Sequence, residues 1–313
     1  MTGSSSNSLT NLANELGEAK ARLAEPLAAH TTYRIGGPAD IFFEALTIDE
    51  LVRAVKLARK YEVPTFILGL GANILVGDGG IRGLVIKNRC SGVSFLLGGQ
   101  VIAEGGVVVG DLIEDCKQKH LSGLEHFAGI PSSVGGALWQ NLHFLAPDRI
   151  RTVFIEECLK GAAILTEENE IIEVHKDYFQ FGYDESVLHR RKDIVLSATF
   201  QLRRGTRAAI QQTIDDNLRW RAEKHPDLKQ FPSAGSVFRK LEGLGAGRLI
   251  DQCGLKGFII GGAQVSPQHA NFIVNLGEAK ASDVLQLIRC CQDKVKEKFG
   301  VELTPEISLV GEF

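Results

Sequence analysis

Two glycine-rich segments contain the residues best suited to bind a charged ligand. The first, residues 67–80, reads "ILGLGANILVGDGG" and begins within the apolar run "PTFIL". Glycine adopts positive φ angles at no steric cost, so successive N–H groups from Gly69 to Asn73 can form an anion-binding nest. The segment lacks the Gly-Lys-Ser/Thr of a P-loop and the spacing of a dinucleotide fingerprint. On this segment alone, a phosphate site and a tight structural turn both remain open.

The second segment, Phe127 to Asn141, reads "FAGIPSSVGGALWQN". It joins a Gly-Ile-Pro turn to Gly135–Gly136 and ends in an amide side chain. Two glycine segments around one ligand allow bare backbone to approach a long, diphosphate-containing cofactor at two places. This strengthens the phosphate interpretation, although two ordinary turns would have the same composition.

The composition gives no sign of a metal site or a nucleic-acid partner. The six cysteines form no Cys-x-x-Cys pair, and the eight histidines form no i, i+4 pair beside acids. Reduced thiols are therefore expected, and the adjacent Cys290 and Cys291 have no assigned role. The net charge of −3 provides no basic face. Without a secretory signal or an apolar stretch of about 20 residues, we expect a soluble cytoplasmic protein that contacts no membrane.

The elements that must position the first glycine segment alternate between helices and strands. The first eight residues predict a disordered tail, and a helix is predicted over residues 9–24, before Pro26. Strands are predicted in "DIFFEA", "TFIL" and "GLVIK", and the helix after the first of them starts at a capping box of Thr47 and Glu50. A strand–helix–strand unit that runs into a glycine loop indicates an α/β or α+β domain.

The rest of the chain is strand-rich up to about residue 204, with one helix that starts near Val109. Another helix ends before Pro226, and a last one covers Ser282 to Phe299, with Gly300 as its stop. The segments "FIIGGAQVS", "NFIVNLG" and the closing "VELTPEISLVGEF" each read as a strand.

Six motifs follow one another from about residue 26 to the C-terminus: "TTYRIGGPAD", "GLGANILVGDGGIRGLVIKN", "GIPSSVGGALWQN", "PSAGSVFRK", "GLKGFIIGGAQVSPQHANFIVN" and "GVELTPEISLVGEF". Together they resemble the UDP-N-acetylenolpyruvoylglucosamine reductase family, the flavoproteins also called UDP-N-acetylmuramate dehydrogenases, which act in peptidoglycan precursor synthesis. The short span between Leu202 and Ser236 resembles the form of the family that lacks an extra tyrosine loop.

This resemblance implies an α+β fold class. It consists of an FAD-binding fold of the vanillyl-alcohol-oxidase/p-cresol-methylhydroxylase type, made of two subdomains, and a smaller α+β substrate-binding domain. We accordingly predict an N-terminal extension at 1–25, FAD-binding subdomains at 26–88 and 89–205, a substrate-binding domain at 206–302, and a C-terminal strand at 303–313 that carries the catalytic glutamate.

The resemblance also implies non-covalent FAD, with its diphosphate on N–H groups of the first glycine loop, and NADPH as the hydride donor. The implied reaction reduces UDP-N-acetylglucosamine enolpyruvate to UDP-N-acetylmuramate. No metal is implied, and we expect a monomer. The residues implied to contact FAD are Tyr33, Gly69, Gly71, Ala72, Asn73, Leu75, Val76, Gly129, Ile130, Pro131, Ser133, Val134, Gly135, Gly136 and Asn141.

By motif match, Ser236 would donate a proton and Glu306 would assist at the intermediate. From the residues alone they read as a turn serine and a strand-edge carboxylate. His269 and Asn271 suit either a substrate contact or a turn. The residues implied to bind substrate are Tyr183, Arg239, Lys240, His269 and Asn271.

Three departures from the family pattern stand out. Asp184 lies where the family usually has the arginine of Tyr-Arg-x-Ser, which stabilises the enolic intermediate, and Arg190 or Arg191 is a possible replacement cation. Lys240 takes an amide position, whereas Arg239 keeps a cation. His143 and Phe144 follow Asn141 where small residues are usual, and the plain interpretation of His143 is loop packing.

These departures leave two further functions open. One is a related FAD oxidoreductase with a changed substrate, and the other is a redox-silent protein that binds FAD or a nucleotide sugar. The motifs "AGS" and "PEIS" favour the active reductase, because a protein freed from catalysis has no chemical need of both.

Overall fold

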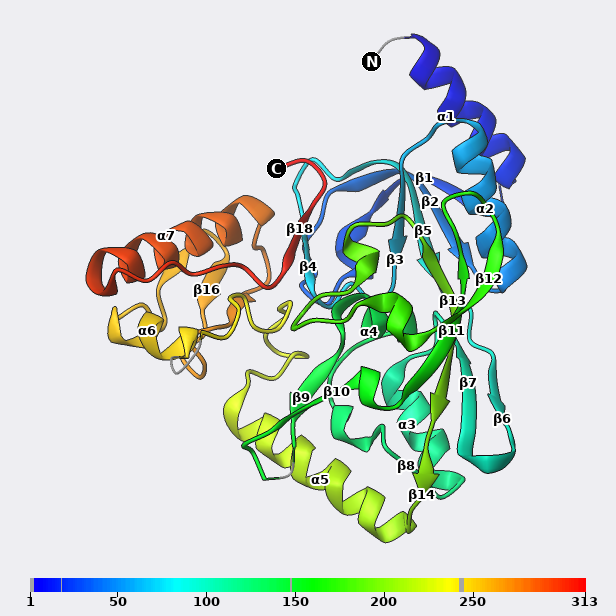
Figure 1. The fold of residues 1–313 in the computed structure, drawn as a ribbon. Coiled ribbons are helices and arrows are strands. Elements are labelled where there is room, and N and C mark those ends of the chain that lie inside the picture. Colours follow the sequence, from blue (N-terminus) through cyan, green and yellow to red (C-terminus); the bar gives the residue numbers. More distant parts are fainter. Residues whose placement is uncertain (1–2, 18, 147, 242–244) are drawn as a thin grey trace. The chain divides into compact units, whose positions relative to one another are not determined.

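The computed structural model describes residues 3–17, 19–146, 148–241 and 245–313. The chain forms two compact units (Figure 1). The first unit comprises Met1–Ala21, Phe43–Leu70 and Ile86–Arg221, and the second comprises Arg22–Phe42, Gly71–Val85 and Ala222–Phe313. Within the described ranges, no helix is long and apolar enough to cross a membrane. The domain boundaries predicted from the sequence stay predictions.

The helices are α1 (Gly3–Leu16), α2 (Ile48–Lys60), α3 (Val109–Gln118), α4 (Val134–Gln140), α5 (Arg207–Lys224), α6 (Ala246–Gln252) and α7 (Ala281–Phe299). The strands are β1 (Ala21–Pro26), β2 (Pro38–Ala45), β3 (Thr65–Leu68), β4 (Ile74–Val76), β5 (Ile81–Asn88), β6 (Val93–Phe95), β7 (Gln100–Glu104), β8 (Leu121–Ser122), β9 (His143–Leu145), β10 (Thr152–Phe154), β11 (Leu159–Leu165), β12 (Ile171–His175), β13 (Ile194–Gln201), β14 (Arg203–Arg204), β15 (Ile259–Ile260), β16 (Ala263–Val265), β17 (Ile273–Asn275) and β18 (Ser308–Val310).

The first unit is built on a five-stranded antiparallel sheet in the order β12-β11-β13-β7-β6 (Figure 1). Helix α4 packs on β13 and β7. The core beneath it holds the fully buried rings of Phe127, Phe179 and Phe200. Apolar side chains that alternate along β13 supply one face of this core.

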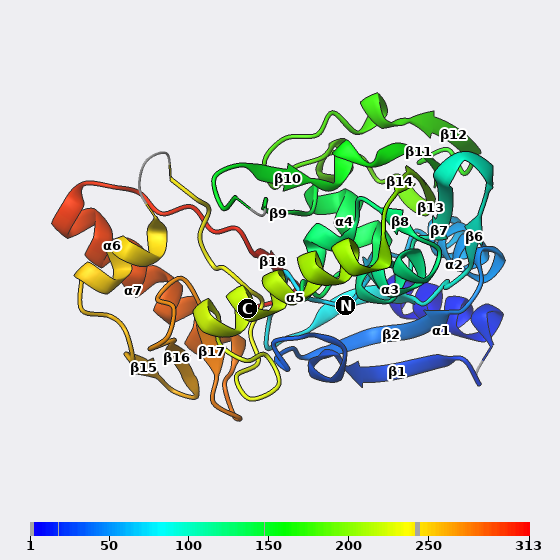
Figure 2. The same cartoon turned by 90° about the horizontal axis from the view of Figure 1, so that it is seen from below.

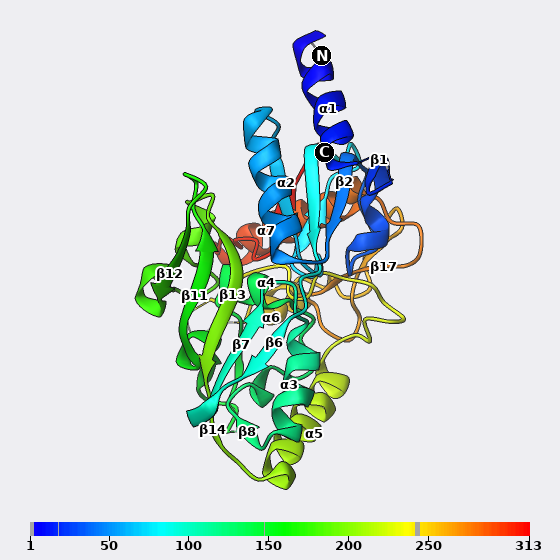
Figure 3. The same cartoon turned by 90° about the vertical axis from the view of Figure 1, so that its right-hand side faces the viewer.

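Helices α1 and α2 lie side by side in the first unit (Figure 3). Leu12 and Leu16 are buried, and Lys60 forms an ion pair with Glu15 at 2.9 Å. The prediction of a helix over residues 9–24 was wrong at both ends. The helix begins at Gly3, inside the segment predicted to be a disordered tail, and it ends at Leu16, where Gly17 adopts a φ of +98°.

The second unit contains the three-stranded antiparallel sheet β15-β16-β17, against which α7 packs (Figure 2). The predicted strand "FIIGGAQVS" is two strands, because Gly261 adopts a φ of +54° and turns the chain into a hairpin. Helix α7 ends as predicted, with Gly300 at a φ of +68°.

The closing segment was also predicted as one strand, yet only β18 is regular. It pairs in parallel with β4, so that Leu309 lies opposite Leu75. A further sheet has the strand order β1-β2-β5-β3, and its strands β2 and β5 continue from one unit into the other along the chain. Strands β2, β3 and β5 lie where the sequence predicted them.

Candidate active site

The first glycine loop connects β3 to β4 and leaves a run of main-chain donors unused. Gly71 adopts a φ of +64°, and a Cβ atom there would lie 2.7 Å from the carbonyl oxygen of His30. The N–H groups of Gly71, Ala72 and Asn73 meet no acceptor among the residues that the structure describes. Consecutive free N–H groups at a glycine with positive φ fit the diphosphate of a dinucleotide.

The last three glycines of that segment, Gly77, Gly79 and Gly80, are structural. The N–H groups of Gly77 and Gly79 donate to Val310 and Glu312 at 2.9 and 2.8 Å. Asp78 accepts from the N–H groups of Ala281 and Ser282, at 2.7 and 3.0 Å, and so caps α7. One glycine run therefore contains both a candidate anion site and a set of tight turns.

Gly69 brings the start of this loop against the second glycine segment within the first unit. A Cβ atom at Gly69 would lie 2.4 Å from Oγ of Ser133. That hydroxyl caps α4 by accepting from the N–H of Gly136 at 3.3 Å. The two segments singled out in the sequence thus meet at a point where only glycine fits.

The second glycine segment is fixed mostly by its own main chain. The N–H groups of Val134 and Gly135 donate to Val107 and Gly105, each at 2.8 Å. These two donors are occupied, so a ligand at this segment would meet its surface rather than these N–H groups. Gly129, at a φ of +81°, precedes the half-buried Ile130 and Pro131.

Several predicted FAD contacts, among them Tyr33, Leu75, Val76 and Asn141, are too deeply buried to offer side chains to a ligand. Tyr33 is fully buried, and its hydroxyl donates to the carbonyl of Ile273 at 2.7 Å. Burial raises the pKa of the Tyr33 hydroxyl. Leu75 and Val76 lie in the core-facing strand β4, and the buried Asn141 donates to Glu156 and Gly182 at 3.0 Å. Any contact of these residues with FAD would come from their main chain.

The second unit brings the two predicted catalytic residues onto neighbouring main-chain segments. The N–H of Glu306 donates to the carbonyl of Val237 at 2.7 Å, and Val237 directly follows Ser236. The adjacent residues Phe238 and Pro305 form an antiparallel bridge. Nδ2 of Asn73, from the first glycine loop, donates to the carbonyl of Glu306 at 3.4 Å. Serine, glutamate and a residue of the anion loop are therefore held by one hydrogen-bonded arrangement.

Asn271 holds the serine segment in place. Its side chain accepts from the N–H of Phe238 at 3.0 Å and donates to the carbonyl of the same residue at 2.9 Å. Its buried position favours this structural role over a substrate contact. His269 packs against the rings of His225 and Phe272, and burial lowers the pKa of its imidazole. Beyond this segment Lys240 is exposed and Arg239 is half-buried.

Tyr183 and Asp184 lie beside His143 in the first unit. The rings of His143 and Tyr183 are 4.5 Å apart, and Nδ1 of His143 lies 3.6 Å from Oδ1 of Asp184. Tyr183 is 40% exposed, whereas Asp184 is 1% exposed. His143 thus packs on an aromatic ring and also lies next to a buried carboxylate.

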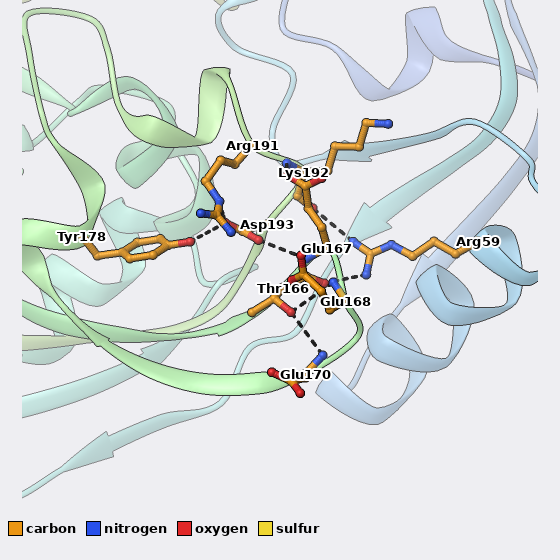
Figure 4. Close-up of polar contacts among 9 residues, drawn as sticks. All are labelled: Arg59, Thr166, Glu167, Glu168, Glu170, Tyr178, Arg191, Lys192 and Asp193. Carbon is orange, nitrogen blue, oxygen red and sulfur yellow. Dashed lines mark hydrogen bonds and ion pairs between the residues drawn. The ribbon is translucent and has the colours of Figure 1, made fainter.

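Arg190 and Arg191, the two candidate replacement cations, are each paired with a carboxylate. Arg190 binds Glu185 at 2.8 Å. Arg191 binds the buried Asp193 at 2.6 Å, beside Tyr178, as Figure 4 shows. Burial and the hydrogen bond to Asp193 raise the pKa of Tyr178 to about 12. Both arginines therefore have carboxylate partners of their own.

Arg221 is a candidate site residue that the sequence analysis did not identify. Its guanidinium lies 5.5 Å from the ring of Phe144, and its Cδ would lie 3.1 Å from a Cβ atom at Gly129. In the described ranges no carboxylate pairs with it, and burial lowers its pKa to about 10. The sequence carried a signal, because Arg221 continues the buried stripe of Ile214 and Asn217 along α5.

The described part of the chain contains no group of three or more His, Cys, Asp or Glu side chains arranged to hold a metal ion.

Comparisons with known proteins agree with these features. Residues 39–175 match the family described as FAD binding domain, and residues 226–310 match the family described as UDP-N-acetylenolpyruvoylglucosamine reductase, C-terminal domain. The first match spans both glycine segments, and the second spans Ser236 and Glu306. The predicted fold class, α+β with an FAD-binding fold, is confirmed.

Whole-chain relatives extend this agreement. A UDP-N-acetylenolpyruvoylglucosamine reductase of Lachnoclostridium phytofermentans is 36% identical over 97% of this chain and 97% of its own. One of Clostridium perfringens is 40% identical over 91% of each chain. The crystal structure of the Thermus caldophilus reductase is 31% identical, with a TM-score of 0.77 over 93% of this chain and 99% of that one. The chain therefore belongs to the UDP-N-acetylenolpyruvoylglucosamine reductase family of FAD-dependent oxidoreductases.

Proposed function

We propose that this protein reduces UDP-N-acetylglucosamine enolpyruvate to UDP-N-acetylmuramate, with FAD as cofactor and NADPH as hydride donor. The observation that carries the proposal is the arrangement of Ser236 and Glu306. Glu306 donates its N–H to the carbonyl of Val237 and accepts from Asn73 of the first glycine loop. A proton donor, a carboxylate and an anion-binding loop are thus tied together by main-chain hydrogen bonds.

The residues present fit FAD. The free N–H groups of Gly71, Ala72 and Asn73 suit its diphosphate, and Gly69 leaves no room for a side chain beside Ser133. Arg221 adds a positive charge next to Gly129. When bound, FAD would supply the chemistry of hydride transfer from NADPH to the β carbon of the enolpyruvyl group.

Ser236 then supplies the proton that the α carbon needs. Its position between Gly235, at a φ of +80°, and Val237 is fixed by the clamp of Asn271 on Phe238. A hydroxyl held in place donates effectively when a neighbouring group stabilises the charge that develops. In this proposal the carboxylate of Glu306 assists at the intermediate, which is supported by the pairing of its main chain with the residue after Ser236.

The exposed Lys240 and the half-buried Arg239 supply positive charge for the diphosphate of the nucleotide sugar. We place the reaction in the cytoplasm, with the protein acting as a monomer.

The test is NADPH consumption by the FAD-loaded protein with and without UDP-N-acetylglucosamine enolpyruvate, with mass spectrometry of the product. The proposal expects oxidation that requires the enolpyruvyl substrate and a product two hydrogens heavier. Flavin that is reduced by NADPH but ignores this substrate would favour the second candidate, a related oxidoreductase with a changed substrate, for which the buried Asp184 is the motivating observation. Failure to bind FAD would favour neither of these two functions.

A further inference from the structure

The turn between β6 and β7 of the first unit carries the most exposed large apolar side chain among the described residues. Leu97 is 96% exposed, and the adjacent Leu96 is 49% exposed. Turns usually place glycine or short polar residues at such positions. A leucine that is almost fully exposed makes few contacts within the fold, so the packing of the first unit does not require a leucine at position 97.

This turn has a fixed shape. The N–H of Leu96 donates to the carbonyl of Gln100 at 2.9 Å, and Gly98 and Gly99 adopt φ angles of +74° and +81°. The N–H of Leu202, which follows β13, donates to the carbonyl of Gly99 at 2.8 Å. Because the backbone is already ordered, burying the two leucines against a partner costs little further conformational entropy.

Positively charged side chains lie beside the turn. Nζ of Lys119 lies 5.7 Å from the ring centre of Phe95, the residue before Leu96. Nη1 of Arg204 donates to the carbonyl of Lys119 at 3.3 Å, and Arg203 precedes it in β14. Figures 1 and 3 show β14 and β8 at the same end of the first unit as the β6–β7 turn.

These three basic residues have no opposite charge beside them. Lys119, Arg203 and Arg204 are exposed, and none of them forms an ion pair with a carboxylate in the part of the chain that the structure describes. The surface around the turn therefore combines two exposed leucines with three positive charges that the protein itself leaves unbalanced.

A lipid bilayer matches this combination better than a protein or a nucleic acid does. The energetic centres of protein interfaces are rich in Trp, Tyr and Arg, whereas leucine is under-represented there. A nucleic acid would pair with the basic residues but offers no apolar layer to the leucines. A bilayer with anionic lipids has both, because negative headgroups border an apolar interior.

We infer that the first unit binds the surface of membranes that contain anionic phospholipids. Leu96 and Leu97 insert below the headgroups, and Lys119, Arg203 and Arg204 contact the phosphates. The contact is peripheral and reversible, because two side chains and three charges anchor far less strongly than a spanning helix. The inference departs from the sequence-based prediction of no membrane contact. That prediction was based on the lack of a spanning stretch, which a peripheral contact does not need.

The first arm of the test is co-sedimentation of the FAD-loaded protein with vesicles of equimolar phosphatidylglycerol and phosphatidylcholine. The wild type is expected to bind these vesicles at least about 10-fold more tightly than vesicles of phosphatidylcholine alone, and added salt is expected to weaken the binding. Leu97→Ser is expected to weaken it about 10-fold, because one inserted side chain is lost. Arg203→Ser combined with Arg204→Ser is expected to weaken it about 10-fold and to reduce its salt dependence.

The matched control is Ile150→Ser. Ile150 is 86% exposed in the same unit and lies between β9 and β10, which Figures 1 and 2 show on the side away from β6. This variant loses a similar apolar area and is expected to bind the mixed vesicles within about twofold of the wild type. Both side chains are almost fully exposed, so neither substitution is expected to disturb folding, and thermal melting checks this.

The second arm tests insertion by tryptophan fluorescence. Leu97→Trp and Ile150→Trp each add one indole, and subtraction of the wild-type spectrum removes the signal of Trp139 and Trp220. Mixed vesicles are expected to shift the added emission to shorter wavelength in Leu97→Trp and to leave it unchanged in Ile150→Trp, because only the first indole leaves water.

A wild-type protein that does not bind the mixed vesicles, or that binds them equally well after Leu97→Ser, would overturn the inference. Equal losses in Leu97→Ser and Ile150→Ser would also overturn it, because any exposed apolar side chain would then suffice. Sedimentation velocity covers a different occupant: a dimer that Leu97→Ser converts to a monomer would assign the turn to a second copy of this chain instead. None of these outcomes depends on the reductase reaction, so the inference and the proposed function fail separately.

Discussion

The serine–glutamate region of the second unit and the histidine–aspartate region of the first unit are built in different ways. Ser236 and Glu306 are positioned by main-chain pairing, with Val237 bonded to Glu306 and Phe238 bridged to Pro305. His143 and Asp184 are positioned by side chains, through an ion pair and two aromatic contacts. The first arrangement needs only a backbone register, whereas the second depends on the identity of each side chain.

This difference determines how each region responds to substitution. The main-chain frame depends on backbone hydrogen bonds, so a change of an exposed side chain beside it, such as Lys240, leaves the frame in place. In the side-chain cluster, each contact is lost with the side chain that makes it.

The largest effect is expected from removing the hydroxyl of Ser236, the predicted proton donor of the second unit. Ser236→Ala is expected to slow reoxidation of the reduced flavin by the enolpyruvyl substrate by about 10²- to 10⁴-fold, the usual contribution of a general acid. Flavin reduction by NADPH is expected to be unchanged, because it needs no proton from this residue. Stopped-flow absorbance of the two half-reactions measures both, and equal slowing of the two would contradict the assignment.

The main-chain frame itself is tested through Asn271. Asn271→Leu leaves the buried N–H and carbonyl of Phe238 without their partner, which is expected to cost about 2–4 kcal/mol in the free energy of unfolding. Urea unfolding followed by circular dichroism measures this loss. As a control, the exposed Lys240→Gln is expected to change stability by less than about 0.5 kcal/mol. A small loss in Asn271→Leu would show that the frame does not depend on this clamp.

The junction of the two glycine segments is tested through Gly69. A methyl group at this position would lie 2.4 Å from Oγ of Ser133, so Gly69→Ala is expected to displace that serine and weaken FAD binding about 10-fold. Ser133→Ala, which removes the conflicting oxygen, is expected to restore part of the affinity when combined with Gly69→Ala. Titration of apoprotein with FAD measures each affinity, and strictly additive effects of the two changes would contradict the close contact.

The smallest expected effect concerns the pH dependence of stability through His269. Burial lowers the pKa of His269 below the usual value of about 6.5, so the unfolded state binds the proton first as the pH falls. Stability from this residue is therefore present above about pH 6.5 and is lost as the pH falls from there toward the folded-state pKa.

Chemical unfolding at pH 7 and pH 5 measures the contribution of His269 to the free energy of unfolding. His269→Gln is expected to reduce this fall in unfolding free energy. The wild-type protein, unfolded at the same two pH values, provides the reference. An identical pH dependence in the wild type and His269→Gln would argue against a buried neutral imidazole.

Much of the fold was predictable because local signals and packing agree. Thr47 caps α2 by accepting from the N–H of Glu50, and Gly300 ends α7 in the left-handed conformation, as the sequence indicated. The N-terminal helix was placed too late, because its polar first turns carry no apolar pattern, and among its described side chains Leu12 and Leu16 are the buried ones. The hairpin at Gly261 was missed because two glycines within an apolar run also suit a single strand.

The candidate site was predictable only where function depends on the main chain. Glycine spacing located both loops, and the motifs located Ser236 and Glu306. The contact of His143 with Asp184 depends on a left-handed residue and two ring contacts that no local pattern records. Arg221 was missed because an arginine at the end of a polar helix usually lies in solvent, and its burial depends on Phe144 from a distant strand.

The most direct test of the reductase assignment is anaerobic stopped-flow absorbance of the FAD-loaded wild-type protein. NADPH is mixed first, and UDP-N-acetylglucosamine enolpyruvate follows once the flavin band has bleached. The account predicts rapid return of the oxidised flavin spectrum together with formation of UDP-N-acetylmuramate. A flavin that NADPH bleaches and that stays reduced in the presence of this substrate would contradict it.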